Sequence, residues 1–93
     1  MKKNRSEIQV IVDFLKCVQD GDEESQVSSI LRKVNITYAK YKELAESLTS
    51  NGLVEVRANG DKQVLILTQK GANFIKDYEK FKKLIESNYG FKI

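Results

Sequence analysis

The sequence predicts an α+β fold in which three helices precede a two-stranded β-hairpin and a fourth, C-terminal helix. Three observations support this order. Polar and apolar residues recur at helical spacing in three stretches before residue 51. Apolar and polar residues then alternate from Leu53 to Leu67 around an Asn-Gly pair, which is typical of a hairpin. A last amphipathic stretch runs from Gln69 to about Ser87.

The composition is that of an ordinary soluble globular chain. Of its 93 residues, 41% are hydrophobic and 31% are charged, so we expect residues 1–93 to form a single domain. The apolar runs are too short for a membrane span, and the first residues lack the apolar segment of a signal peptide. One cysteine, Cys17, cannot form an internal disulfide. These features predict a cytoplasmic protein that does not enter a membrane.

The first helix is expected to end near Asp20, where a glycine follows, and to be capped by Ser6 or Asn4. Its polar residues form one narrow stripe, and the remaining positions are almost all apolar. Such a helix needs burial on more than one side. It is therefore either central in the fold or in contact with a second chain. The stripe consists of Gln9, Asp13, Lys16 and Asp20.

The next two helices form a helix-turn-helix pattern. The second is expected over residues 26–34, capped by Ser25, and "NIT" then breaks the chain. The third begins after Thr37, runs to about Ser50, and has Gly52 available for a left-handed cap. A helical wheel places three residues at its buried centre, with Ala45 at the edge. These three are Tyr41, Leu44 and Leu48.

The hairpin and the last helix complete the pattern. Leu53 to Leu67 forms the hairpin, and Thr68 caps the last helix. Three helices followed by a two-stranded hairpin is the order of a winged helix. The loop around Asn59 to Lys62 would then be the wing.

Particular residues also resemble a known family. The spaced pattern "LxxxLxxxGLVxxR" together with "LTQKG" is similar to the frame of many prokaryotic winged-helix regulators. "NITYA" resembles the small archaeal winged-helix DNA-binding proteins of the 10-kDa Sulfolobus chromatin-protein type. The resemblance covers roughly Ile8 to Phe81 and implies binding of double-stranded DNA. That family dimerises through a long C-terminal coiled-coil helix, whereas the last helix here is shorter. The matching positions are Leu44, Leu48, Gly52, Leu53, Val54, Arg57 and Leu67 to Gly71.

Twelve Lys or Arg oppose seven Asp or Glu from Ser25 onward. This excess either favours a polyanion on one side of the molecule or belongs to an ordinary solvated surface of mixed charge. The opening of the third helix is small, aromatic and basic, and Glu43 and Glu46 mark where a DNA contact should end. Thr37 either contacts DNA or only caps the third helix. Tyr38 either contacts DNA or is a partly buried packing residue. The wing either reaches a minor groove or is a bare type I′ turn. The candidates are Thr37, Tyr38, Ala39, Lys40 and Lys42; Arg32 and Lys33; and Arg57, Asn59, Gly60 and Lys62.

A homodimer is the second expectation. A short heptad pattern of apolar residues lies along the last helix. Beyond Tyr78 this helix should extend past the rest of the domain, so residues 74–93 are expected to reach into an interface. Together with the apolar first helix, this argues for a second copy of the chain as partner. Cys17 is alternatively a small core residue. The candidate interface residues are Val10, Phe14, Cys17, Phe74, Tyr78, Phe81, Leu84 and Ile85.

Catalysis finds little support in the sequence. The chain has no histidine and no glycine-rich phosphate loop, so we expect neither an enzyme nor a metal or cofactor. No small-molecule ligand is evident. We therefore expect a DNA-binding transcription regulator or chromatin-associated protein. The alternative is a winged helix used for contacts between proteins, which the acidic half of the third helix favours.

Overall fold

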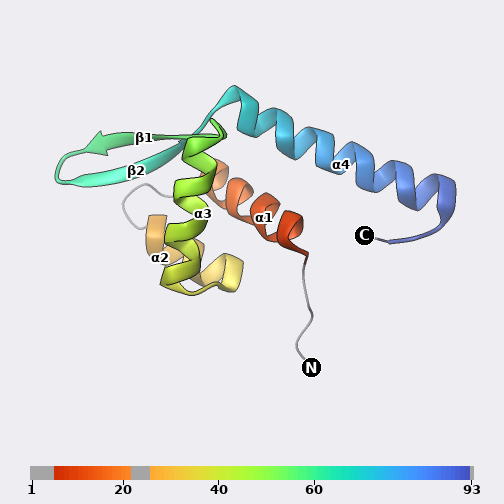
Figure 1. The fold of residues 1–93 in the computed structure, drawn as a ribbon, viewed down its shortest axis with the longest axis horizontal. Coiled ribbons are helices and arrows are strands. Elements are labelled where there is room, and N and C mark those ends of the chain that lie inside the picture. The colour runs from red at the N-terminus through yellow and green to blue at the C-terminus, as the bar shows by residue number, and fades with distance from the viewer. Residues whose placement is uncertain (1–5, 22–25, 93) are drawn as a thin grey trace.

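The computed structural model describes residues 6–21 and 26–92, and its elements follow the predicted order (Figure 1). The predicted caps Asn4 and Ser25 lie outside the described residues. None of the described helices is both long and apolar enough to cross a membrane. The elements are α1 (Glu7–Asp20), α2 (Gln26–Ile30), η2 (Leu31–Asn35), α3 (Tyr38–Ser50), β1 (Val54–Asn59), β2 (Lys62–Leu67) and α4 (Gln69–Tyr89).

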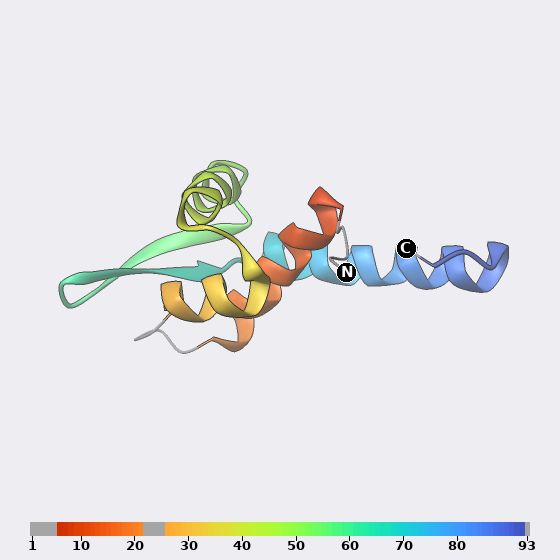
Figure 2. The same ribbon diagram turned by 90° about the horizontal axis from the view of Figure 1, so that it is seen from below.

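The hairpin lies between α3 on one side and α2 on the other, and α1 runs past the base of the hairpin (Figure 2). Helix α1 occupies the centre of the fold and contacts α2, η2, β2 and α4. Its residues Val12, Phe14 and Leu15 are fully buried within the single chain. The expected central position of this apolar helix is therefore confirmed. The core cluster around it includes Phe14, Leu15, Ile30, Val34, Leu44, Leu48, Val54, Leu65 and Ile75.

Three hydroxyl caps fix the starts of the long helices: Thr37 and Thr68, as the sequence predicted, and Ser6, one of the two caps that it allowed for α1. The side-chain oxygens of Ser6, Thr37 and Thr68 accept hydrogen bonds from backbone N–H groups three residues later, at 3.2, 3.1 and 3.1 Å. Each bond satisfies a donor that the first helical turn would otherwise leave unpaired. Helix α3 ends at Ser50, and Gly52 takes the expected left-handed conformation with φ 77°.

The second helix differs from the prediction in its last turn. It reaches Asn35 rather than ending at Val34, and residues 31–35 form a π-helical turn in which Ile36 N–H donates to Leu31 C=O at 3.3 Å. Asn35 itself is left-handed, with φ 62°, a conformation that asparagine tolerates better than most residues. This widened turn and the left-handed backbone at Asn35 set the direction of α3 relative to the second helix.

The hairpin turn also differs from the prediction. The last strand pair is Asn59 with Lys62, so the two turn residues are Gly60 and Asp61 rather than Asn59 and Gly60. Only Gly60 has a positive φ, of 65°. A type I′ turn needs positive φ at both central residues, whereas a type II′ turn needs it at the first alone. The type I′ interpretation was therefore wrong.

Gln26 joins the hairpin to α2 in a way that sequence patterns did not reveal. Its side chain is 5% exposed. Its amide nitrogen donates to Leu65 C=O, and its amide oxygen accepts from Leu65 N–H, each at 2.8 Å. The side chain therefore occupies the position that a third strand would take on the outer edge of β2. It fixes the hairpin relative to the helices.

Helix α4 is anchored at its beginning and projects away from the body (Figures 1 and 2). Gly71 packs so closely on Leu53 that an added Cβ would lie 2.2 Å from the carbonyl oxygen. Further along, Tyr78 O–H donates to Gln9, and Lys16 pairs with Glu79 at 2.9 Å. The described chain measures 49 × 34 × 21 Å, with a radius of gyration of 14.2 Å.

Candidate nucleic-acid interface

The first turn of α3 presents an ordered aromatic and basic surface. Tyr38 is 57% exposed, and Ala39 and Lys42 are also exposed. The Tyr38 ring stacks on Tyr41 at 6.0 Å between centroids, and Tyr41 stacks on the buried Phe14 at 5.6 Å. Lys42 Nζ lies 5.8 Å from the centre of the Tyr38 ring. This chain of contacts holds an exposed tyrosine and a cation in place from the core outward.

Tyr41 lies nearer the surface than the helical wheel indicated. It is half-buried, whereas Leu44 and Leu48 are fully inside, as expected. Burial raises the pKa of the Tyr41 phenol, and the neighbouring Tyr38 raises it further. Tyr41 therefore remains a neutral hydroxyl at physiological pH. Its position connects the core to the surface turn.

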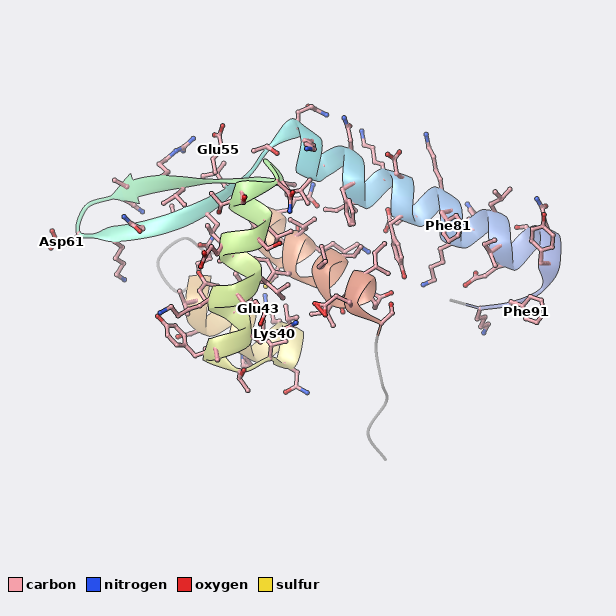
Figure 3. The ribbon with its side chains drawn as sticks, viewed as in Figure 1. Lys40, Glu43, Glu55, Asp61, Phe81 and Phe91 are labelled. Carbon is pink, nitrogen blue, oxygen red and sulfur yellow. The ribbon has the colours of Figure 1, made fainter. Side chains whose placement is uncertain are left out.

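Lys40 has a structural partner instead of an open position. Its ammonium donates to Glu7 at 2.8 Å and to Glu43 at 3.3 Å, and Figure 3 shows Lys40 beside Glu43. The hydrogen bonds that Lys40 donates to Glu7 and Glu43 raise its pKa above the ordinary value of 10.5. Lys40 thus ties the start of α3 to α1. Its charge is largely compensated before any partner arrives.

Thr37 performs the capping role that was one of its two interpretations. Its oxygen accepts from the Lys40 backbone N–H, and the side chain is exposed. A hydroxyl has one hydrogen to donate in addition to its acceptor sites. Capping therefore leaves Thr37 able to donate to a phosphate oxygen.

The remaining predicted cations lie around α3. Arg32 and Lys33 are exposed on η2, and Arg57 is exposed on β1. The other predicted wing residues, Asn59, Gly60 and Lys62, are exposed as well. The turn itself carries Asp61, which Figure 3 shows at the extreme tip. Positive charge therefore flanks the wing tip instead of covering it.

The residues predicted for a dimer interface separate into two groups. Phe81 and Leu84 are 55% and 53% exposed, and Val10, Phe74 and Ile85 are half-buried. The other three are Phe14, Cys17 and Tyr78, which are buried within the single chain at 8% exposure or less. They have little surface to offer a second chain, so their predicted place in a dimer interface is not retained.

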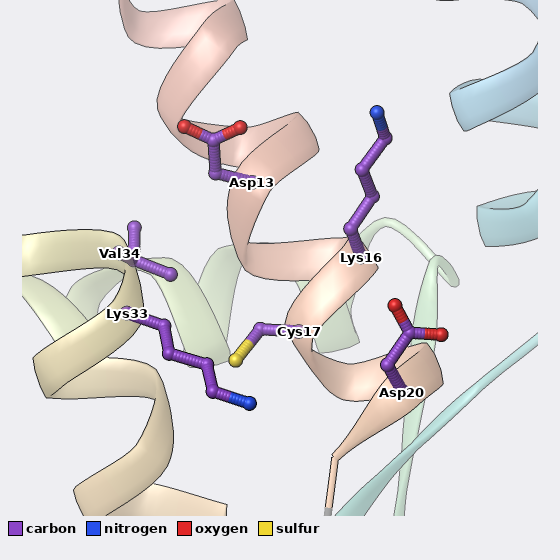
Figure 4. A pocket seen from close by; sticks show the side chains of 6 residues that line it. All are labelled: Asp13, Lys16, Cys17, Asp20, Lys33 and Val34. Atoms are coloured by element: carbon purple, nitrogen blue, oxygen red, sulfur yellow. The ribbon is translucent and has the colours of Figure 1, made fainter.

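Cys17 borders a small polar cleft of about 350 Å³ between α1 and η2 (Figure 4). Asp13, Lys16 and Asp20 line one side of the cleft, and Lys33 lines the other. Within the part of the chain that the structure describes, no cluster of histidine, cysteine and carboxylate side chains could hold a metal ion. The thiol serves as a small residue at the edge of the core.

Comparisons with known proteins agree with this architecture. The family model described as "Winged helix-turn-helix" matches residues 4–86. The crystal structure of Sso10a-2, described as a DNA-binding protein from Sulfolobus solfataricus, superposes with a TM-score of 0.76 at 19% identity, covering 92% of this chain and 87% of that one. A winged-helix DNA-binding protein from STIV gives 0.66 at 23% identity, covering 88% and 95%. No curated protein matches the sequence significantly.

Proposed function

This chain belongs to the winged helix-turn-helix family, and from that membership we propose that it binds double-stranded DNA as a homodimeric regulator or architectural protein. The observation that carries the proposal is the exposed first turn of α3, where Tyr38 and Lys42 are held outward by stacking on the core. Both solved relatives named above are described as DNA-binding proteins, which supports the same conclusion.

In the proposed complex the first turn of α3 enters the major groove. Tyr38 and Lys42 face the bases or their phosphates, and the capping Thr37 donates to the backbone. Arg57 lies on the adjacent backbone or minor groove beside the wing. Lys40 is not among the proposed contacts, because Glu7 and Glu43 already hold its ammonium. Lysine lacks the two-pronged geometry of arginine, so backbone contacts should outnumber base-specific ones.

Duplex binding at several salt concentrations tests the proposal. If Arg32, Lys33, Lys42 and Arg57 each neutralise a phosphate, log K should fall against log salt with a slope of about −3.6 per protomer. Fluorescence anisotropy with a labelled duplex measures this slope. Absence of duplex binding at low salt would refute the proposal and favour a role in contacts between proteins.

A matched pair of variants localises the contact. Lys42→Glu should weaken duplex binding about tenfold at low salt and reduce the salt slope by about one, since it removes one cation from the α3 surface. Lys92→Glu makes the same charge change on an exposed residue beyond the end of α4 and should bind nearly as wild type. Unaltered binding by a folded Lys42→Glu protein would exclude this face of α3.

Dimerisation is proposed through the projecting part of α4. Phe81, Leu84 and Tyr89 are all more than half exposed along the segment that leaves the body of the molecule, and Ile85 lies among them. Exposed apolar side chains in such a row are typical of a surface that a second chain covers. A two-fold pair would also place two α3 helices on successive turns of one duplex.

Sedimentation equilibrium tests the dimer directly. The wild-type chain of 10.6 kDa should sediment with about twice that mass at high micromolar concentration. Phe81→Glu should give the monomer, because a carboxylate cannot be buried unpaired in an apolar interface. Lys83→Glu, two residues away and about 200° around the helix, should remain dimeric. A wild-type monomer at these concentrations would reject the interface.

A further inference from the structure

An apolar groove of about 560 Å³ separates α3 from the hairpin. The two elements meet where β1 begins and diverge toward the hairpin tip (Figure 1). Tyr38, Tyr41 and Ala45 line the helix side, and Val56 and Leu65 line the strand side. Alternation along β1 puts Val56 on this face and its neighbour Glu55 on the opposite one. The groove therefore lies beside the surface proposed for DNA.

The walls of this groove carry apolar surface that the chain does not cover. Val56 and Tyr38 are 50% and 57% exposed. Each nevertheless lies beside a residue that belongs to the core or packs against it. The volume falls within the range of about 300–1,000 Å³ that is usual for sites binding small molecules. Apolar walls combined with a few polar groups are also the usual composition of such sites.

Charge decides which kind of small molecule fits. Among the described residues that line the groove, Glu46 is the one charged side chain, and none of these residues is a cation. Thr49, Ser50 and Gln63 add neutral polar groups. Lys42 lies over the Tyr38 ring and does not line the groove. Its charge would repel a positively charged ligand from that ring, which directs the ligand's cation toward Glu46. An anionic ligand would meet a carboxylate with no counter-charge.

We propose that this groove binds a small aromatic amine, with its ring between Val56, Leu65 and Tyr41 and its ammonium at Glu46. The site shares Tyr38 with the proposed DNA surface. A bound amine therefore competes with duplex DNA, and the groove is an effector site. This competition rests on the proposed function, whereas binding of the amine does not.

Three indole probes of different charge test the site without DNA. They are tryptamine, a cation; tryptophol, which is neutral; and indole-3-acetate, an anion. In amide NMR titrations tryptamine should give saturable shifts centred on Tyr38, Ala45, Val56 and Leu65. Tryptophol should bind about threefold more weakly, as expected for loss of one exposed ion pair, and indole-3-acetate more weakly still.

Variants separate the apolar and the charged parts of the site. Ala45→Leu fills the groove, and Val56→Lys places a cation on its exposed wall, so each should abolish the tryptamine shifts. Glu46→Gln should make tryptamine and tryptophol bind equally. Glu55→Gln makes the same charge change on the other face of β1 (Figure 3) and should preserve their difference. Because Val56 is exposed, Val56→Lys should fold even if Ala45→Leu does not.

The results that overturn the inference are distinct from failure of DNA binding. Absence of saturable shifts up to roughly 10 mM tryptamine, or shifts centred elsewhere, would reject the site. Equal affinity for the three probes would reject its assignment to amines. In the competition test, saturating tryptamine should weaken duplex binding by the wild type and leave Val56→Lys unaffected. Unchanged wild-type affinity would reject the effector role while leaving amine binding intact.

Discussion

Replacing Gln26 by leucine should destabilise the fold more than its position at the start of a short helix indicates. The wild-type amide satisfies both the N–H and the C=O of Leu65 in a buried setting. Leucine would leave both groups without partners, at about 1–3 kcal/mol each. Added apolar burial offsets part of this cost. The net loss should be about 2–4 kcal/mol, which corresponds to a decrease of about 10–20 °C in Tm.

Glutamate at this position provides a second measurement. Its carboxylate can accept from Leu65 N–H but cannot donate to Leu65 C=O, so burial beside that carbonyl raises the pKa of the introduced carboxyl above its ordinary value of about 4.3. A raised pKa in the folded state means stability that is fully present at low pH and lost as pH rises. Gln26→Glu should therefore approach the wild type in acid and fall behind it toward neutral pH.

Urea denaturation and hydrogen exchange measure both effects, at one fixed protein concentration because the stability of a dimer depends on concentration. The Leu65 amide should exchange faster in Gln26→Leu, since its acceptor is gone. Gln19→Leu makes the same chemical change on an exposed residue of α1 and should alter stability by less than about 0.5 kcal/mol. If Gln26→Leu were as stable as Gln19→Leu and its Leu65 amide stayed protected from exchange, the two hydrogen bonds between Gln26 and Leu65 would not be what holds the hairpin.

Three further predictions concern the helices. Gly71→Ala should lower the free energy of unfolding by about 1–3 kcal/mol in a denaturant titration, because the new Cβ meets the Leu53 carbonyl oxygen. Thr37→Ala should cost about 1 kcal/mol through loss of the α3 cap, whereas Thr37→Ser should retain it. Lys16 lowers the pKa of Glu79 below its ordinary value of 4.5. The Lys16–Glu79 ion pair therefore stabilises the fold above that pH, and its contribution is lost as the pH falls. Wild type and Glu79→Gln should thus differ in stability at neutral pH and converge in acid; a difference that persisted in acid would contradict this explanation.

Two features that depend on local sequence, the helix caps and the presence of the hairpin, were predicted correctly. A hydroxyl cap acts within three residues of itself, so Ser6, Thr37 and Thr68 could be identified without tertiary information. The hairpin was also evident from alternation. Its turn was misplaced by one residue because the strands pair over their full six residues, Val54 with Leu67 and onward. A turn at Asn59 and Gly60 would leave the end of β2 without partners on β1.

Contacts distant in sequence could not be predicted. Gln26 and Leu65 are 39 residues apart, and nothing in a helical wheel indicates that a glutamine at the start of α2 will meet a strand edge. Lys40 and Glu7 are 33 residues apart, so a wheel drawn for α3 alone placed Lys40 among the free cations. The wheel gives the direction of a side chain, whereas the partner in that direction comes from the packing of α1.

The projecting α4 also affects how the molecule moves through solution. A compact chain of 93 residues would have a radius of gyration of about 12 Å, against the observed 14.2 Å. Its largest dimension of 49 Å is more than twice its smallest, 21 Å. Viscous drag on such a shape exceeds that on a sphere of equal mass. A single chain should consequently elute early from a gel-filtration column calibrated with globular standards, imitating a heavier particle.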